Sequence, residues 1–202
     1  MFEHLKGRIP HEIDEEKMKR SAVMIALVEK GGEYEILFEM RSGKLKHQPG
    51  EICLPGGMRE PGESACENAV RETAEELCID ETQIEVIAQL DSLRNVANIK
   101  LDVFLCRLHD YHMTFAEDEV EEVFTVPLAF FYQTKPDVYR NQVKTIPPDD
   151  FPFDKIPGGK AYPWRKAYRD IYFYDYKDKV IWGMTAYIMQ HSISLLQDKS
   201  RQ

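Results

Sequence analysis

The stretch from Gly57 to Ile79 constrains this chain more than any other, because it has to be a loop that opens directly into a helix. Proline and glycine occur too densely between residues 54 and 62, in the sequence LPGGMREPG, for a helix or a central strand. Ser64 and Glu67 have the spacing of a capping box, in which both side chains bind free backbone N–H groups at a helix start. We therefore expect a helix that begins at Ser64.

The expected helix has two faces of different chemistry. At about 100° per residue, one face is mostly apolar and should pack on the body of the protein. Glu72 and Glu76 fall together elsewhere, and being four apart they repel each other by about 0.2–0.5 kcal/mol if nothing lies between them. The sequence therefore favours a cation at this place. The apolar face consists of Cys66, Val70, Thr73, Ala74 and Leu77.

The charged residues of this stretch have a fixed spacing. Arg71 lies four residues before Glu75, so the two can pair and hold the acidic cluster in place. At roughly 7% per residue type, the six identities of the pattern G-x5-E-x7-R-E-x2-E-E arise by chance about once in ten million windows. A solvated glutamate-rich face, the simplest interpretation of any two of these glutamates, does not explain the combined spacing. The six are Gly57, Glu63, Arg71, Glu72, Glu75 and Glu76.

This pattern closely resembles the Nudix box, the signature of the Nudix hydrolase family. The resemblance implies an enzyme that cleaves a nucleoside diphosphate linked to another moiety, with divalent cations such as Mg²⁺ or Mn²⁺ held by the helix. Hard cations of this kind take carboxylate oxygens as ligands. Thr73 and Cys78 depart from the box at positions that are not ligands, so the end of the helix could be built differently. By the family pattern the main metal ligands are Glu72 and Glu76, with Glu75 and the Gly57 carbonyl as further ones, and Arg71 and Glu63 orient the cluster.

The segment from Arg41 to Gly57, RSGKLKHQPGEICLPGG, is similar to the one before the box in the coenzyme A pyrophosphatase subgroup, L-L-T-x-R-S-x3-R/K-x3-G-x3-F-P-G-G. Glu39 stands where that pattern has threonine, and Leu54 where it has phenylalanine. The matching positions, which the resemblance places against the substrate or beside it, are Arg41, Ser42, Lys46, Gly50, Pro55, Gly56 and Gly57.

Basic residues in this segment suit a phosphorylated ligand. Arginine offers a bidentate fork to phosphate and lysine a point charge. Coenzyme A carries a 3′-phosphate besides its diphosphate, so Arg41, Lys44 and Lys46 fit such a ligand in an otherwise acidic chain. For Arg41 or Lys46 alone, a basic surface loop leading to a strand is an equal alternative.

A second acidic segment follows from Glu117 to Glu122, before a strand that ends in Val126-Pro127-Leu128. It looks like a downstream segment common in Nudix enzymes, where a glutamate supplies a further metal ligand or a base for the attacking water. Glu119 and Glu122 are the candidates, and a solvated acidic loop is the alternative.

The remaining pattern predicts a mixed α/β protein. Residues 21–28 form a continuous apolar run typical of a buried strand, and residues 34–41 follow as a hairpin partner. The family resemblance implies a Nudix α/β/α sandwich, a mixed β-sheet between helices. Further expected elements are a short helix within 1–20, strands at 51–54, at 83–93 with Ile84, Val86 and Ile87 on the buried side, and at 101–108 and 170–176, a helix at 127–133, a segment 180–183 that leads into a final helix, and an irregular aromatic and proline-rich segment at 134–170.

Composition limits the organisation and the partners. With 202 residues and 43% hydrophobic side chains, the chain should form one domain over residues 1–202. Its net charge of −9 argues against a nucleic-acid surface. The absence of an 18-residue apolar run and the polar N-terminus predict no membrane span, no signal peptide and a cytoplasmic location. Four cysteines without CxxC spacing support neither a zinc site nor a disulfide framework.

The resemblance therefore implies hydrolysis of coenzyme A or an acyl derivative to 4′-phosphopantetheine and 3′,5′-adenosine bisphosphate. Three alternatives stay open at this point. The substrate could be ADP-ribose or a dinucleotide, because the box selects the diphosphate and not its flanking group. The chain could bind a nucleotide without hydrolysing it, or the aromatic segment could make it chiefly a partner-binding protein. That segment also suggests a substrate lid, a pocket wall or a homodimer contact.

Overall fold

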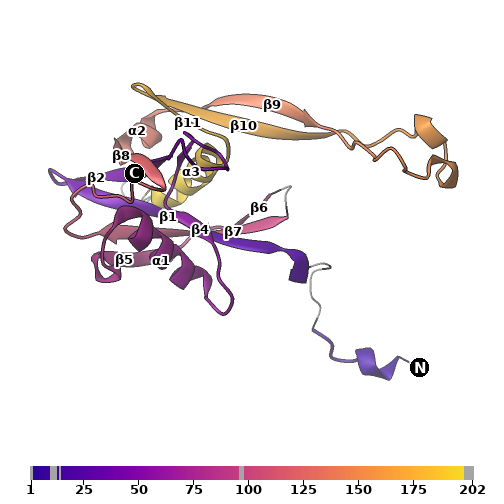
Figure 1. The fold of residues 1–202 in the computed structure, drawn as a ribbon, viewed down its shortest axis with the longest axis horizontal. Helices are drawn as coiled ribbons and strands as arrows, with labels where there is room; N and C mark the ends of the chain where they lie inside the picture. Colours follow the sequence, from indigo (N-terminus) through magenta and orange to yellow (C-terminus); the bar gives the residue numbers. More distant parts are fainter. Residues whose placement is uncertain (1, 10–12, 14, 96–97, 198–202) are drawn as a thin grey trace. The chain divides into compact units, whose positions relative to one another are not determined.

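A computed structural model describes residues 2–9, 13, 15–95 and 98–197 of the chain. They divide into two compact units, one up to Tyr132 and one from Gln133 onward, whose ribbon is drawn in Figure 1. The expectation of one domain stays a prediction, because two compact units do not show whether they fold together. Among the described residues, no helix is long and apolar enough to cross a membrane.

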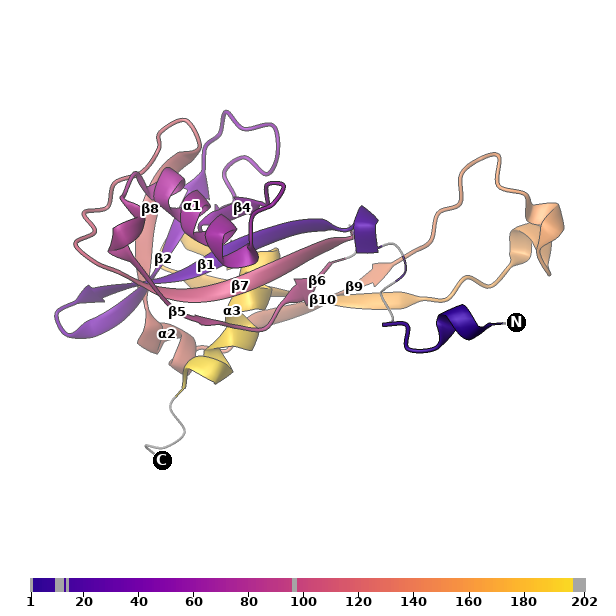
Figure 2. The same cartoon turned by 90° about the horizontal axis from the view of Figure 1, so that it is seen from below.

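The first unit is built on the mixed sheet that the sequence predicts. Strands β1 and β2 form the expected antiparallel hairpin, with Leu27 opposite Ile36. β1 runs parallel to β7, and Figure 2 shows β1, β7 and β5 side by side. β1 lies in the interior of the sheet and is almost wholly buried from Ala22 to Val28, as expected for a strand whose two faces are both covered. The strands are β1 (Lys19–Lys30), β2 (Glu33–Arg41), β3 (Ile52–Cys53), β4 (Gly56–Met58), β5 (Ile84–Gln89), β6 (Leu93–Arg94), β7 (Ile99–Leu108) and β8 (Val120–Pro127).

Helix α1 (Ala65–Leu77) covers one face of this sheet. Its predicted start is confirmed, since Ser64 and Glu67 form the capping box. Its apolar face packs in the core that also holds Met24 and Leu37. The helix ends at Cys78, which adopts the left-handed conformation that glycine usually supplies there. The helix therefore ends in the left-handed conformation that a glycine would adopt, although the residue at this position is Cys78.

The opposite face of the sheet carries the short helix α2 (Leu128–Gln133). Leu37 points toward α1, so Phe38, the next residue of β2, points the other way. The Phe38 ring lies 5.8 Å from that of Phe124 and 5.9 Å from that of Phe131 in α2. The sheet thus has helices on both faces, as expected.

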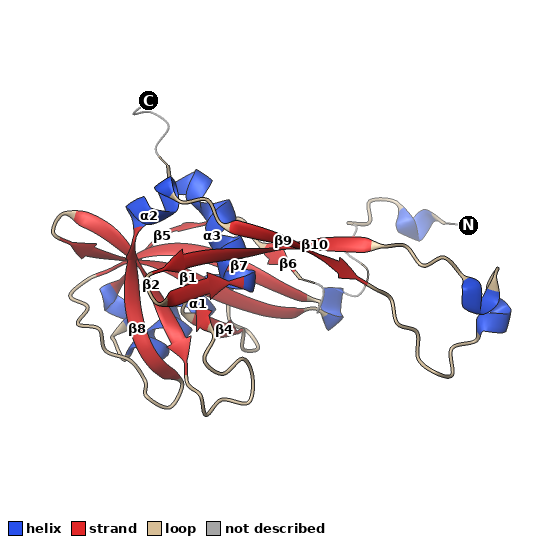
Figure 3. Ribbon diagram, turned by 90° about the horizontal axis from the view of Figure 1, so that it is seen from above, coloured by secondary structure: helices blue, strands red, loops and turns tan. Residues whose placement is uncertain are grey.

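The second unit is a three-stranded antiparallel sheet with one helix, coloured red and blue in Figure 3. Its strands are β9 (Asp137–Val143), β10 (Ala167–Tyr176) and β11 (Lys179–Trp182), in the order β11-β10-β9. Helix α3 (Gly183–Leu196) packs on β10, where the Tyr174 hydroxyl donates to Gln190 Oε1 at 2.7 Å. Single turns of 3-10 helix occur at Glu3–Leu5, Glu15–Lys17, Glu81–Gln83, Phe153–Lys155 and Gly159–Ala161.

Two details of the sequence prediction are wrong. The segment 134–170 is not irregular throughout, because β9 and the start of β10 pair within it. All seven residues of β9 are exposed, so the strand has no buried side and no hydrophobic alternation to reveal it. Ile87, expected on the buried side of β5, is 45% exposed because a bulge between Val86 and Ala88 removes it from the register with β7.

Candidate functional site

The centre of the site is Glu76 of α1, whose side chain is buried against strand β4. Glu76 is 5% exposed, and its Oε2 accepts the backbone N–H of Gly56 at 2.8 Å. Glu72, one turn earlier, lies over Gly57 so closely that a Cβ on this glycine would sit 2.4 Å from the carboxyl carbon. The two glycines thus allow the β4 backbone to meet both carboxylates.

Arg71 organises the exposed side of this cluster. Its guanidinium forms ion pairs with Glu63, Glu72 and Glu75, each with a nitrogen–oxygen distance of 2.9 Å. Glu75, the most exposed of the three, contacts it as the predicted partner four residues away. The geometry matches the orienting role that the resemblance implies for Arg71 and Glu63.

Burial makes the cluster costly to ionise. Burial is the main cause that raises the pKa of Glu76 to about 8; the charges of Glu72 and Glu119 act in the same direction, and the Gly56 N–H and Arg41 oppose them. Burial also raises the pKa of Glu72, against the lowering effect of the Arg71 guanidinium. A cation bound between these carboxylates would offset the repulsion between their negative charges. Without a cation, a proton on Glu76 reduces the same repulsion.

Glu39 belongs to the same cluster and was missed as a site residue by the sequence analysis. It is 1% exposed and its carboxyl group is hydrogen-bonded to that of Glu76. Burial and the Glu76 charge hold its pKa well above the usual range. Two signals in the sequence could have identified it: the position directly after the apolar run Ile36-Leu37-Phe38 and two residues before Arg41, and the departure from threonine in the subgroup pattern.

Arg41 lies with these acids. Its charge lowers the pKa of Glu39 and of Glu76, and its side chain is hydrogen-bonded to the Cys53 thiol. Its Nε is buried without a hydrogen-bond partner. The structure therefore brings Arg41, predicted as a phosphate ligand, to the edge of the carboxylate cluster.

The other residues of the predicted phosphate segment lie in the loop after β2. Ser42 is buried and its N–H donates to the Glu119 carbonyl at 2.8 Å, which joins this loop to the second acidic segment. Gly50 is exposed, has a positive φ of 71°, and closes the loop through its N–H to the Arg41 carbonyl. Lys46 is exposed on the same loop. The structure leaves its amine accessible to an anionic ligand.

The two downstream candidates separate. Glu119 is exposed and close enough to raise the pKa of Glu39, Glu72 and Glu76. Glu122 pairs with Met40, next to Glu39 on β2, and therefore points to the opposite face of the sheet. The structure brings Glu119 to the cluster and does not bring Glu122.

The donor set fits a hard divalent cation, although the described part of the chain holds no group of three or more His, Cys, Asp or Glu side chains closed around a metal position. Arg71 is paired with Glu72, and the Gly56 N–H donates to Glu76. Carboxylate and carbonyl oxygens are the ligands that Mg²⁺ and Mn²⁺ prefer. The Gly57 carbonyl accepts the Ser21 hydroxyl at 2.7 Å and keeps a second lone pair. Oε1 of Glu39 is buried without a partner.

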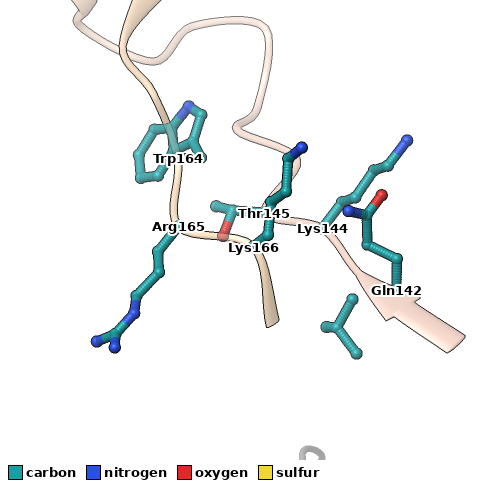
Figure 4. A pocket seen from close by; sticks show the side chains of 7 residues that line it. Gln142, Lys144, Thr145, Trp164, Arg165 and Lys166 are labelled. Carbon is teal, nitrogen blue, oxygen red and sulfur yellow. The ribbon is translucent and has the colours of Figure 1, made fainter. Parts of the chain in front are cut away.

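Described residues of the second unit line at least two cavities. One, of about 200 Å³, lies where β9 ends and β10 begins, and Figure 4 shows Trp164, Arg165 and Lys166 on one chain segment of its wall and Lys144 on the other. The Arg165 guanidinium points away from the two lysines in this view, so the three cations do not converge. The other, of about 530 Å³, lies against Tyr139, Phe173 and Trp182.

Comparison with known proteins gives consistent matches. A family model described as NUDIX domain matches residues 18–147. Peroxisomal coenzyme A diphosphatase NUDT7 of Mus musculus is 36% identical over 138 residues, which cover 64% of this chain and 55% of that protein. Nudix hydrolase 15, mitochondrial, of Arabidopsis thaliana is 27% identical over 98% of this chain and 66% of that protein. Nudix hydrolase 3 of Caenorhabditis elegans is 26% identical over 57% of this chain and 50% of that protein. The chain spans between half and two thirds of the length of these relatives.

Proposed function

The chain belongs to the Nudix family, and on that premise we propose that it is a metal-dependent hydrolase of the diphosphate of coenzyme A or its acyl derivatives. The products would be 4′-phosphopantetheine and 3′,5′-adenosine bisphosphate. The observation that carries the proposal is the network in which Arg71 holds Glu63, Glu72 and Glu75 beside the buried Glu76. A module that only bound nucleotides would not need these carboxylates intact.

The residues of the site would divide the work by position. Glu72, Glu75, Glu76 and the Gly57 carbonyl would hold Mg²⁺ or Mn²⁺, which would supply Lewis-acid activation of the diphosphate and of a water molecule. Glu119 is exposed at the edge of the cluster, where its carboxylate would accept the proton of the attacking water. Arg71 would keep the ligand carboxylates oriented.

Substrate choice would depend on the loop after β2. Lys46 is exposed there and would bind the 3′-phosphate, while Arg41, at the carboxylate cluster, would bind the diphosphate. ADP-ribose is the alternative substrate, because the metal ligands alone do not distinguish the flanking group. The specific feature that favours coenzyme A is the match of Arg41, Ser42, Lys46 and Gly50 to the subgroup pattern.

We expect coenzyme A to be preferred over its 3′-dephospho form. Losing one charge-assisted hydrogen bond costs about 1.5–3 kcal/mol, so the ratio of kcat/KM values should be roughly tenfold or more. Lys46→Ala should reduce this ratio more than it reduces hydrolysis of the dephospho compound. The measurement is kcat/KM for coenzyme A, dephospho-coenzyme A and ADP-ribose, with product identification.

Lys30→Ala is the matched control, because Lys30 pairs with Glu35 at the β1–β2 hairpin. It should leave the ratio unchanged. Equal efficiency on the two coenzyme A forms would remove the phosphate-binding role of the loop, and a clear preference for ADP-ribose would establish the alternative.

A homodimer through the open face of the second unit's sheet is also proposed. Tyr139, Phe173 and Trp182 contact one another there, with ring centroids 5.5 and 5.8 Å apart, whereas α3 packs on the opposite face. Arg169 and Asp175 lie six positions apart on β10 on this open face, so a two-fold axis between them would oppose each arginine to the aspartate of a second copy. Light scattering should give twice the chain mass, and Trp182→Ser should give the monomer. A monomeric wild type would refute the proposal.

The predicted cytoplasmic location, and the absence of nucleic-acid and membrane partners, stay predictions. The organelles in the relatives' names describe those proteins. Microscopy of the tagged full chain in cells would test the predicted cytoplasmic location.

A further inference from the structure

We propose that Glu39 is a further carboxylate ligand of the divalent-cation site, an inference that rests on the proposed function of the α1 cluster. The Nudix box would supply its ligands from α1 and from Gly57 of β4, whereas Glu39 comes from strand β2. The evidence is the position, burial and hydrogen bonding of its side chain.

Strand β2 aims Glu39 at the site. Leu37 of the same strand packs against α1, and alternate strand residues share a face, so Glu39 points to the same side. It lies opposite Cys53 of β3 and Val123 of β8, in the interior of the sheet. Only 1% of Glu39 is exposed, and its carboxyl group contacts that of Glu76. A cation at Glu76 would therefore be within reach of Glu39.

The hydrogen bonding of Glu39 is incomplete. Its Oε1 is buried and has no hydrogen-bond partner, although buried polar atoms in proteins almost always have one. Arg41, the basic residue beside it, does not fill this place, because its own buried Nε also lacks a partner. An oxygen that is desolvated, unpartnered and next to a metal-ligand carboxylate has the properties of a coordination position.

The charges around Glu39 also favour a cation, and not a further hydrogen-bond donor of the protein, as the partner of its Oε1. The charges of Glu76 and Glu119 act on Glu39, and the charge of Arg41 opposes them. A residue needed only for packing would be apolar, and the similar subgroup pattern has threonine here. A carboxylate at this buried position is explained by a cation that it helps to bind.

The test is direct binding of Mn²⁺ to the full chain without substrate, measured by calorimetry and by electron paramagnetic resonance of free Mn²⁺. Glu39→Gln keeps the size of the side chain and its hydrogen bond to Glu76 but removes the charge. We expect it to weaken Mn²⁺ binding by at least about tenfold, since even residues outside the coordination sphere change metal affinity about 10–100-fold. Glu35→Gln is the matched control on the same strand and should bind Mn²⁺ as the wild type does.

Glu39→Thr is a second variant in case Glu39→Gln does not fold, because the coenzyme A pyrophosphatase pattern has threonine at this position. It should weaken Mn²⁺ binding to the same extent. Wild-type affinity in a folded Glu39→Gln or Glu39→Thr variant would overturn the proposal. So would a wild type that binds no Mn²⁺. Because no substrate is present, a chain that binds Mn²⁺ through Glu39 but leaves coenzyme A intact would refute the proposed function and uphold this inference.

Discussion

Glu76→Gln should reduce turnover by at least about 100-fold, because a direct metal ligand contributes more than outer residues, whose loss costs about 10–100-fold. The amide keeps the shape of the side chain and its place beside the Gly56 N–H. Steady-state rates at saturating Mg²⁺, together with Mn²⁺ titration, measure both consequences. Near-normal turnover with unchanged Mn²⁺ affinity would remove Glu76 from the site.

The same substitution should leave the fold intact and change how stability depends on pH. The pKa of Glu76 is about 8 in the folded chain and near 4.5 in the unfolded chain. The folded state therefore binds more protons between these values, so the metal-free wild type loses stability as pH rises from 4.5 to 8. Glu76→Gln removes this proton, although Glu39 still titrates, so its melting temperature should fall less over that range. An identical pH dependence in wild type and variant would contradict the buried position of Glu76.

Gly57→Ala should inactivate the site without unfolding the protein. The new Cβ would lie 2.4 Å from the Glu72 carboxyl, which has to move, whereas the backbone conformation suits any residue. We expect a loss of about 10–100-fold in activity or metal affinity, the size found when ligand orientation is disturbed. Urea unfolding should show little change in stability.

Two glycines provide the comparison. Gly56 has a φ of 145°, and a Cβ there would lie 2.3 Å from the Ala22 carbonyl oxygen, so Gly56→Ala should destabilise the fold. The loss should be at least about 3 kcal/mol, the upper end of ordinary single substitutions. At Gly43 a Cβ would meet only Glu121 Oε2, at 3.7 Å, so Gly43→Ala should be neutral. Equal effects of the three substitutions would contradict the close approach of β4 to α1.

The sequence predicted those features that depend on local spacing. The Ser64–Glu67 capping box, the β1–β2 hairpin and the Arg71–Glu75 pair each involve residues whose separation along the chain determines their contact. Such signals need no knowledge of the tertiary structure, and the structure confirms all three.

Features that depend on strand register could not be predicted in this way. Glu122 points away from the cluster because β8 pairs with β2 in a register that the sequence does not specify. Glu39 is a site residue because the sheet places it beneath α1, 37 positions before Glu76 in the chain. Strand β9 exists through pairing with β10 and not through a hydrophobic pattern of its own. In each case the decisive contact joins segments far apart in sequence.

The most direct test of the account is identification of the products formed from coenzyme A by the full chain, with Mg²⁺ and after exhaustive chelation, between pH 6 and 9. We expect 4′-phosphopantetheine and 3′,5′-adenosine bisphosphate in equal amounts, only with metal, and at rates that rise on the alkaline side of neutrality, where a metal-activated water is more often ionised. Intact coenzyme A under all conditions, or full hydrolysis after chelation, would contradict it.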